Sequence, residues 1–95
     1  MEKEITDVKL DKYFDVTSRA LKKAEVAFND EFLALAKDFF DMASRYFEDA
    51  KFFRGRGDYV LAYGAINYAH GWLDAGARAG FFLVKDSVLF TVDDN

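Results

Sequence analysis

The stretch from Asp58 to Gly80 constrains the fold more than any other part of the chain. Its apolar residues occupy nearly the whole circumference of a helix, and most of its few polar residues share one line. A helix that is apolar all round is usually buried. Gly76 and Gly80 each lower helix propensity by about 1 kcal/mol relative to Ala, so they suit places where another backbone comes close. We therefore predict a helix over residues 58–80, around which the rest of the chain is built.

Two further apolar stripes precede this segment, each repeating every three or four residues. The first follows Thr6, a good N-cap, and predicts a helix over 6–28, while the second predicts a helix over 30–53. The Asn-Asp-Glu sequence at 29–31 suits a helix start and marks the break between them. The two stripes are in phase, and no Gly or Pro lies between residues 5 and 53, so one long helix is an open alternative. The mean helix length of about 11–12 residues favours two helices.

Because the chain has no Pro, its turns must come from Gly, Asn and Asp. The clearest loop is 54–58, which alternates Arg and Gly and ends on Asp58, a residue suited to cap the following helix. Near the C-terminus, 85–87 resembles a turn, and 88–92 is β-branched and aromatic. We therefore predict a short extended tail within 81–95. One strand is not stable alone, so this tail must lie on the helices or pair with another chain.

The composition fits an all-α protein with a single domain covering residues 1–95. Apolar residues make up 52% of the chain and aromatic residues 18%, including eleven Phe. This is more bulky apolar side chain than one small core easily hides. The composition therefore indicates a surface for self-association or for a protein partner.

Charge and missing residue types exclude several function classes. A net charge of −4 argues against a general nucleic-acid binder, because phosphate neutralisation supplies most non-specific affinity. No Cys is present, which excludes thiol chemistry and Cys-type zinc sites. No run of about 18 apolar residues and no basic-plus-apolar leader is visible, so we expect a cytoplasmic protein away from the membrane. The Glu-x-x-His pattern of bundle metal sites is missing, and we predict no metal and no cofactor.

Two groups of side chains are candidates for a functional site. Arg54 and Arg56 precede a predicted helix N-terminus at Asp58, where backbone N–H groups can bind phosphate. Capping of the preceding helix explains the same residues. His70 and Asp74 are four residues apart on one helix, so the carboxylate could orient the imidazole for proton transfer. A partly buried His satisfied by its neighbour explains this pair as well.

Asp74 and Arg78 share the same spacing, which gives either a surface ion pair or a contact across an interface. No Ser lies in a nucleophile motif, so we predict no catalytic residue and favour a protein that is not an enzyme. The candidate ligand or interface residues are Arg54, Arg56, Asp58, Asn67, His70, Trp72, Asp74 and Arg78.

Several stretches resemble domain-of-unknown-function family 357, whose members are short archaeal proteins, sometimes joined to a nucleotidyltransferase-like domain. The strongest likeness runs from Tyr68 to Gly80, and it extends to 57–60, 46–50 and 21–25. The resemblance implies a three-helix up-and-down bundle and an archaeal source, and it brings no activity. In the family the connection between the first two helices tends to be longer than 29–31.

The main functional hypothesis is therefore a non-catalytic helical interaction module that binds itself or a protein partner. The alternative is a nucleotide-, phosphate- or RNA-binding protein that acts through the basic loop at 51–58 and through His70 and Asp74.

Overall fold

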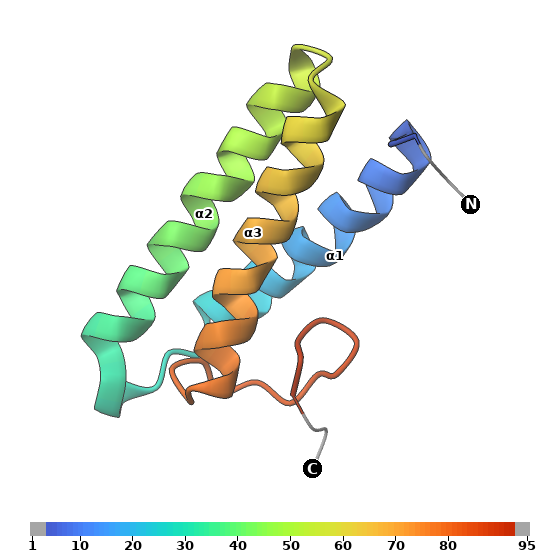
Figure 1. Cartoon of the computed structure of the whole chain (residues 1–95). Helices are drawn as coiled ribbons and strands as arrows, with labels where there is room; N and C mark the ends of the chain where they lie inside the picture. Colours follow the sequence, from blue (N-terminus) through green and yellow to red (C-terminus); the bar gives the residue numbers. More distant parts are fainter. Residues whose placement is uncertain (1–3, 93–95) are drawn as a thin grey trace.

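The structure is a computed structural model that describes residues 4–92. It contains three α-helices, α1 (Asp7–Glu25), α2 (Leu33–Gly55) and α3 (Tyr59–Arg78), with a short 3-10 helix, η1 (Asp30–Phe32), before α2. α1 and α3 run in one direction and α2 returns in the other (Figure 1). The chain is thus an all-α three-helix up-and-down bundle, as predicted, and no strand forms among the described residues.

The break between α1 and α2 shows that the single long helix is wrong. α1 begins at the predicted cap, where Thr6 Oγ1 accepts from the backbone N–H of Lys9, but it ends three residues earlier than predicted. The backbone after it pairs with the end of the chain instead. Asn29 N–H donates to Phe81 O at 2.9 Å, and Leu83 N–H donates to Ala27 O at 2.8 Å. These partners are distant in sequence, so the local pattern could not locate the end of α1.

α2 and α3 form a hairpin with small residues along its seam. Ala36, Ala43 and Ala50 of α2 follow each other at a spacing of seven and are fully buried. Ala62, Ala69 and Gly76 repeat the same spacing on α3 and are buried too. Because these positions carry only methyl groups or hydrogens, the helix axes can approach closely. The large aromatic side chains therefore lie on the two flanks of the hairpin.

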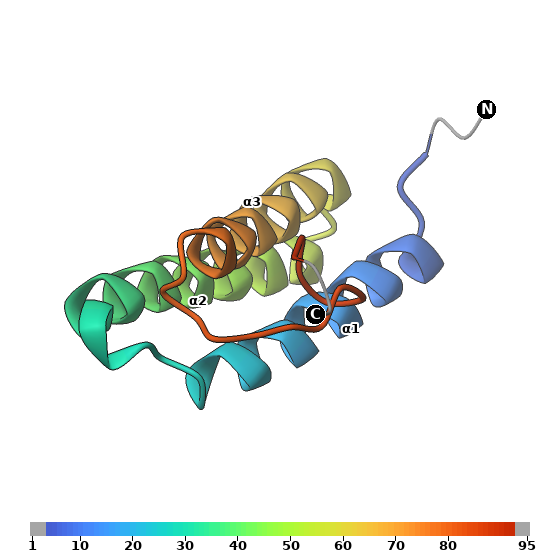
Figure 2. The same cartoon turned by 90° about the horizontal axis from the view of Figure 1, so that it is seen from below.

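One flank of the hairpin is covered by α1 and by the C-terminal segment (residues 81–92). Figure 2 shows both on the same side of α2 and α3. On this side the rings of Phe14 and Phe47 lie 5.6 Å apart and those of Phe28 and Phe40 lie 5.5 Å apart, centre to centre. The opposite flank carries no further element of the described chain near the loop that joins α2 to α3, and at its other end Phe81 packs on Phe39 at 4.9 Å. The prediction that the third helix is buried all round is therefore wrong on that side, where Leu61 and Tyr68 are each about half exposed.

The C-terminal segment lies on the bundle, but its predicted extended part is misplaced. Residues 83–86 form no turn, whereas the backbone changes direction at residues 87–90. Asp86 causes the turn, since its side chain accepts from Val88 N–H at 3.0 Å and its carbonyl accepts from Phe90 N–H at 2.9 Å. Leu89 and Phe90 are thereby buried against the helices.

The two glycines predicted to admit another backbone have other roles. Gly80 has φ +81°, and this left-handed conformation ends α3. At Gly76, the space that a Cβ would need is taken by the ring of Phe82. Gly76 thus admits an aromatic side chain from the C-terminal segment rather than a neighbouring helix.

Candidate functional site

The uncovered flank of the hairpin carries an apolar groove, which we call the hairpin groove. Its volume is about 380 Å³ and its lining is mostly apolar. It lies near the loop that joins α2 to α3, with residues of both helices in its walls. The lining residues are Tyr46, Asp49, Phe53, Val60, Leu61, Gly64, Ala65 and Tyr68.

A line of aromatic rings continues the groove toward the opposite end of the hairpin. Tyr46 and Tyr68 meet edge to face at 4.4 Å, and Tyr68 is followed by Trp72 at 6.3 Å. Trp72 in turn meets Phe39 edge to face at 5.0 Å, and Phe39 meets Phe81 at 4.9 Å. Edge-to-face pairs are a favourable ring geometry, so each ring fixes the next. The groove is therefore preformed rather than loosely packed.

Polar groups on this flank are few. Asp49 is the charged residue in the groove lining, and it makes no ion pair within the described chain. The indole N–H of Trp72 is buried without a hydrogen-bond partner among residues 4–92. A buried donor without an acceptor is unfavourable, so the packing of the rings must offset it. Trp72 is the sequence-predicted candidate that the structure places beside the groove.

The basic loop predicted to bind phosphate is neutralised by its own chain. Arg54 lies 2.6 Å from Asp11 and 3.2 Å from Asp7, both on α1. Arg56 donates from Nε to Asp58 at 3.0 Å, and Asp58 makes no side-chain cap for α3. Both guanidinium groups therefore face carboxylates, and a phosphate would have to displace them.

The same cluster contains a coupled tyrosine and acid. The Tyr59 hydroxyl donates to Asp7 at 2.6 Å. This hydrogen bond, with the bond from Arg54, holds the pKa of Asp7 below its ordinary value. The bond to Asp7 raises the pKa of Tyr59 in return. The cluster joins the first turn of α1 to the hairpin loop and has the features of a structural contact.

His70 and Asp74 hold the C-terminal segment in place. His70 Nε2 lies 2.7 Å from Leu89 O, and a carbonyl oxygen can only accept, so Nε2 donates. The other ring nitrogen lies 2.9 Å from the hydroxyl of Thr17, a buried residue of α1. Asp74 accepts from Thr91 N–H at 2.8 Å and from the Thr91 hydroxyl at 3.0 Å.

His70 and Asp74 therefore both bind other parts of the chain, and their side chains also approach each other to 3.7 Å. His70, Asp74 and Asn67 line a small hollow of about 220 Å³ between α1 and α3. Asn67 is bound to its own helix, donating to Tyr63 O at 2.9 Å. Arg78, in the last turn of α3, is exposed and makes no ion pair within the described chain.

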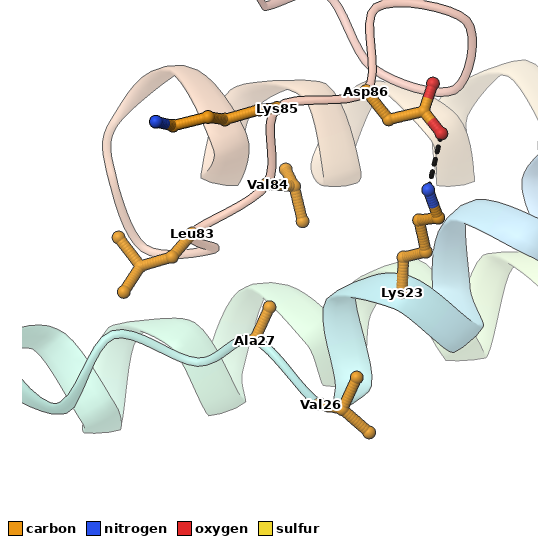
Figure 3. A pocket seen from close by; sticks show the side chains of 7 residues that line it. All are labelled: Lys23, Val26, Ala27, Leu83, Val84, Lys85 and Asp86. Atoms are coloured by element: carbon orange, nitrogen blue, oxygen red, sulfur yellow. Dashed lines mark hydrogen bonds and ion pairs between the residues drawn. The ribbon is translucent and has the colours of Figure 1, made fainter. Parts of the chain in front are cut away.

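A third hollow, of about 590 Å³, lies between the end of α1 and the C-terminal segment. Figure 3 shows Lys23 and Asp86 joined across one end of it, with an N–O distance of 2.6 Å. This contact lowers the pKa of Asp86, chiefly through the hydrogen bond that Lys23 donates. Leu83, Val84 and Lys85 line it on the side of the C-terminal segment. No sequence motif pointed to this hollow, because its walls come from residues about sixty positions apart.

Metal-binding and membrane-spanning features are not found in the described part of the chain. Among residues 4–92, no group of three or more His, Asp or Glu side chains is placed to hold a metal ion. None of the helices in the same range has the length and apolar character required to cross a membrane.

Comparison with known proteins gives a family without an assigned activity. No curated protein and no solved structure matches the chain. One family model does match, described as "Protein of unknown function (DUF357)", and it covers residues 12–82. The match includes all of α2 and α3 and most of α1. The chain therefore belongs to the DUF357 family.

Proposed function

We propose that this protein is a non-catalytic helical interaction module that binds a protein surface through the hairpin groove. The observation that carries the proposal is the uncovered aromatic flank of α2 and α3, where Leu61 and Tyr68 are each about half exposed beside a preformed groove. Contiguous apolar surface rimmed by polar residues is typical of protein interaction sites. Tyr and Trp are also the residue types that most often dominate binding energy.

The other candidate residues support this proposal by being occupied elsewhere. The arginines of the basic loop face carboxylates of α1 and of the loop itself. His70 and Asp74 bind the C-terminal segment. The hairpin groove, in contrast, combines exposed apolar area with side chains that are not bound to other parts of the described chain.

Site-specific photo-crosslinking tests the proposal. Leu61 is replaced by the photoreactive residue benzoylphenylalanine, and the protein is irradiated in a lysate of its native cells. We expect a covalent adduct whose second component, another protein or a second copy of this chain, is identified by mass spectrometry. Val26 is the matched control, because it is 85% exposed but lies at the end of α1, away from the groove. Equal labelling from both positions, or none from position 61, would contradict the proposal.

A further inference from the structure

We infer that the face formed by α1 and α3 is a peptide-binding site, which residues 86–91 of this chain occupy as a tethered ligand. When the tethered segment is released, the site takes the same segment from a second copy of the chain. This surface is separate from the hairpin groove, so the inference goes beyond the proposed function. We call it the α1–α3 site and define it by Thr17, Ala20, His70, Leu73 and Asp74.

Two side chains of α3 hold the segment largely by its backbone. His70 donates to Leu89 O at 2.7 Å, and Asp74 accepts from Thr91 N–H at 2.8 Å. The Thr91 hydroxyl also donates to Asp74, at 3.0 Å. A few convergent polar groups in a mostly apolar surface are typical of ligand sites. These groups suit a peptide that offers a carbonyl and, two residues later, an N–H group.

The side chains of the segment fill the apolar part of the α1–α3 site. Leu89 is 1% exposed and Phe90 is 3% exposed. Both belong to the buried cluster that contains Ala20 of α1 and Leu73 of α3. Burial of large apolar side chains is the main favourable contribution to peptide association. The chemistry of the ligand is therefore two adjacent apolar side chains followed by Thr.

The part of the chain that tethers this ligand to the bundle is loosely packed. Leu83 is 64% exposed, and the hollow of about 590 Å³ lies between residues 83–86 and the end of α1. The contact of Lys23 with Asp86 crosses one end of the hollow (Figure 3). The tether therefore contributes little packing of its own, in contrast to the two buried side chains that follow it.

The walls of the site are held together by residues outside the C-terminal segment. Arg54, at the end of α2, contacts Asp7 and Asp11 of α1. Halfway along α1, the rings of Tyr13 and Tyr63 meet edge to face at 5.3 Å. Because these contacts do not involve the segment, α1 and α3 stay associated when the segment leaves.

The family match separates the site from its ligand. The matched residues 12–82 include Thr17, His70 and Asp74, and they end before residues 86–91. A second copy offers a segment of identical sequence, so it makes the same contacts with the site. Exchange of an identical element between copies is a low-cost route to association.

Binding of a synthetic peptide to the full-length chain tests the site. The probe is a fluorescein-labelled peptide of residues 83–92, added to the wild type and to Leu89→Ala, whose own segment lacks a buried side chain. We expect fluorescence anisotropy to give a Kd about tenfold or more lower for Leu89→Ala, because the intact tethered segment competes at high effective concentration. Asp86→Ala removes the turn and the contact with Lys23 but no buried side chain, and the same result is expected.

The control probe is the same peptide with Leu89→Ala, which should not bind. Circular dichroism verifies that each variant of the protein is folded. Absence of binding to both folded segment variants, equally tight binding to the wild type, or equal binding of the control peptide overturns the inference.

Mixing two full-length variants tests exchange between copies. Leu89→Ala supplies an intact site, and Asp74→Ala supplies an intact segment whose own site has lost both hydrogen bonds to Thr91. We expect native mass spectrometry to show a heterodimer in the mixture and monomers of each variant alone. Asp38→Ala replaces Asp74→Ala as the matched control, because Asp38 is an exposed carboxylate on α2, and it should give several-fold less heterodimer. No heterodimer, or equal amounts with the control, overturns the exchange.

Discussion

At the scale of single residues, most of the polar side chains in this protein join parts of the chain that are distant in sequence. His70 contacts both α1 and the C-terminal segment, Asp86 binds Lys23, and Arg54 binds the first turns of α1. His70 and Arg54 were candidates from the sequence, but their partners were not, and neither Lys23 nor Asp86 was a candidate. The His70–Asp74 spacing was correctly interpreted as a local contact, but Thr17 and Thr91, which give the pair its role, carry no motif.

The coupling of Tyr59 to Asp7 gives a prediction for pH dependence. Tyr59→Phe removes the hydroxyl that donates to Asp7, and the variant should unfold at lower urea concentration at neutral pH. A carboxyl with a lowered folded-state pKa stabilises the fold fully above its ordinary value of 3.8 and loses this contribution as pH falls through the folded-state pKa. The stability difference between wild type and variant should therefore shrink below pH 3.8.

Urea unfolding at a series of pH values checks this expectation. Tyr63→Phe is a suitable control, since Tyr63 is also on α3 and its hydroxyl is not part of the Asp7 cluster. A difference between wild type and Tyr59→Phe that stays constant down to pH 2 would show that the hydroxyl does not act through the charge of Asp7.

At the scale of the elements, the seam of α2 and α3 decides where the aromatic side chains lie. The helical periods of the sequence predicted three helices and their order, because an apolar stripe is a local property. They could not predict which flank of the hairpin is covered, since that depends on where α1 and the C-terminal segment pack. For the same reason, the groove residues Tyr46, Phe53, Leu61 and Tyr68 were not among the sequence candidates, and only Trp72 lies beside them.

Enlarging one seam residue should force the hairpin apart. Ala43 is fully buried midway along α2, so Ala43→Leu places three extra carbons into a filled space. Overpacking of this kind lowers the free energy of unfolding by about 1–3 kcal/mol. Chemical denaturation measures the loss, with Ala34→Leu on the exposed side of α2 as a control that should change stability by less than about 0.5 kcal/mol. Equal effects of the two substitutions would mean that the seam is not closely packed.

At the scale of the whole molecule, the C-terminal segment acts as a fourth packing element. Phe82, Leu89 and Phe90 belong to the same buried cluster as Ala20 of α1 and Leu73 of α3. The composition of this segment predicted that it lies on the helices or pairs with another chain, and in the structure it lies on the helices. Its shape was not predicted, because the turn at Asp86 is favoured only when the following apolar side chains can reach the core.

Removing one of these side chains should weaken the entire fold. Leu89→Ala deletes a side chain that is 1% exposed, and a buried Leu→Ala change costs about 2–5 kcal/mol. The adjacent Val88 is 75% exposed, so Val88→Ala is the matched control and should have little effect. Thermal unfolding followed by circular dichroism compares the two. A Leu89→Ala variant as stable as the wild type would show that the bundle does not depend on the C-terminal segment.

The position of Leu89 and Phe90 also separates the unit that folds from the unit that the family model recognises. The model ends at Phe82, whereas both of these buried side chains follow it. A recombinant fragment cut at the matched boundary would keep every family position and still expose part of its interior, including the faces of Ala20 and Leu73. For proteins of this family, expression boundaries are therefore better chosen from the packing of the last buried residue than from the extent of sequence similarity.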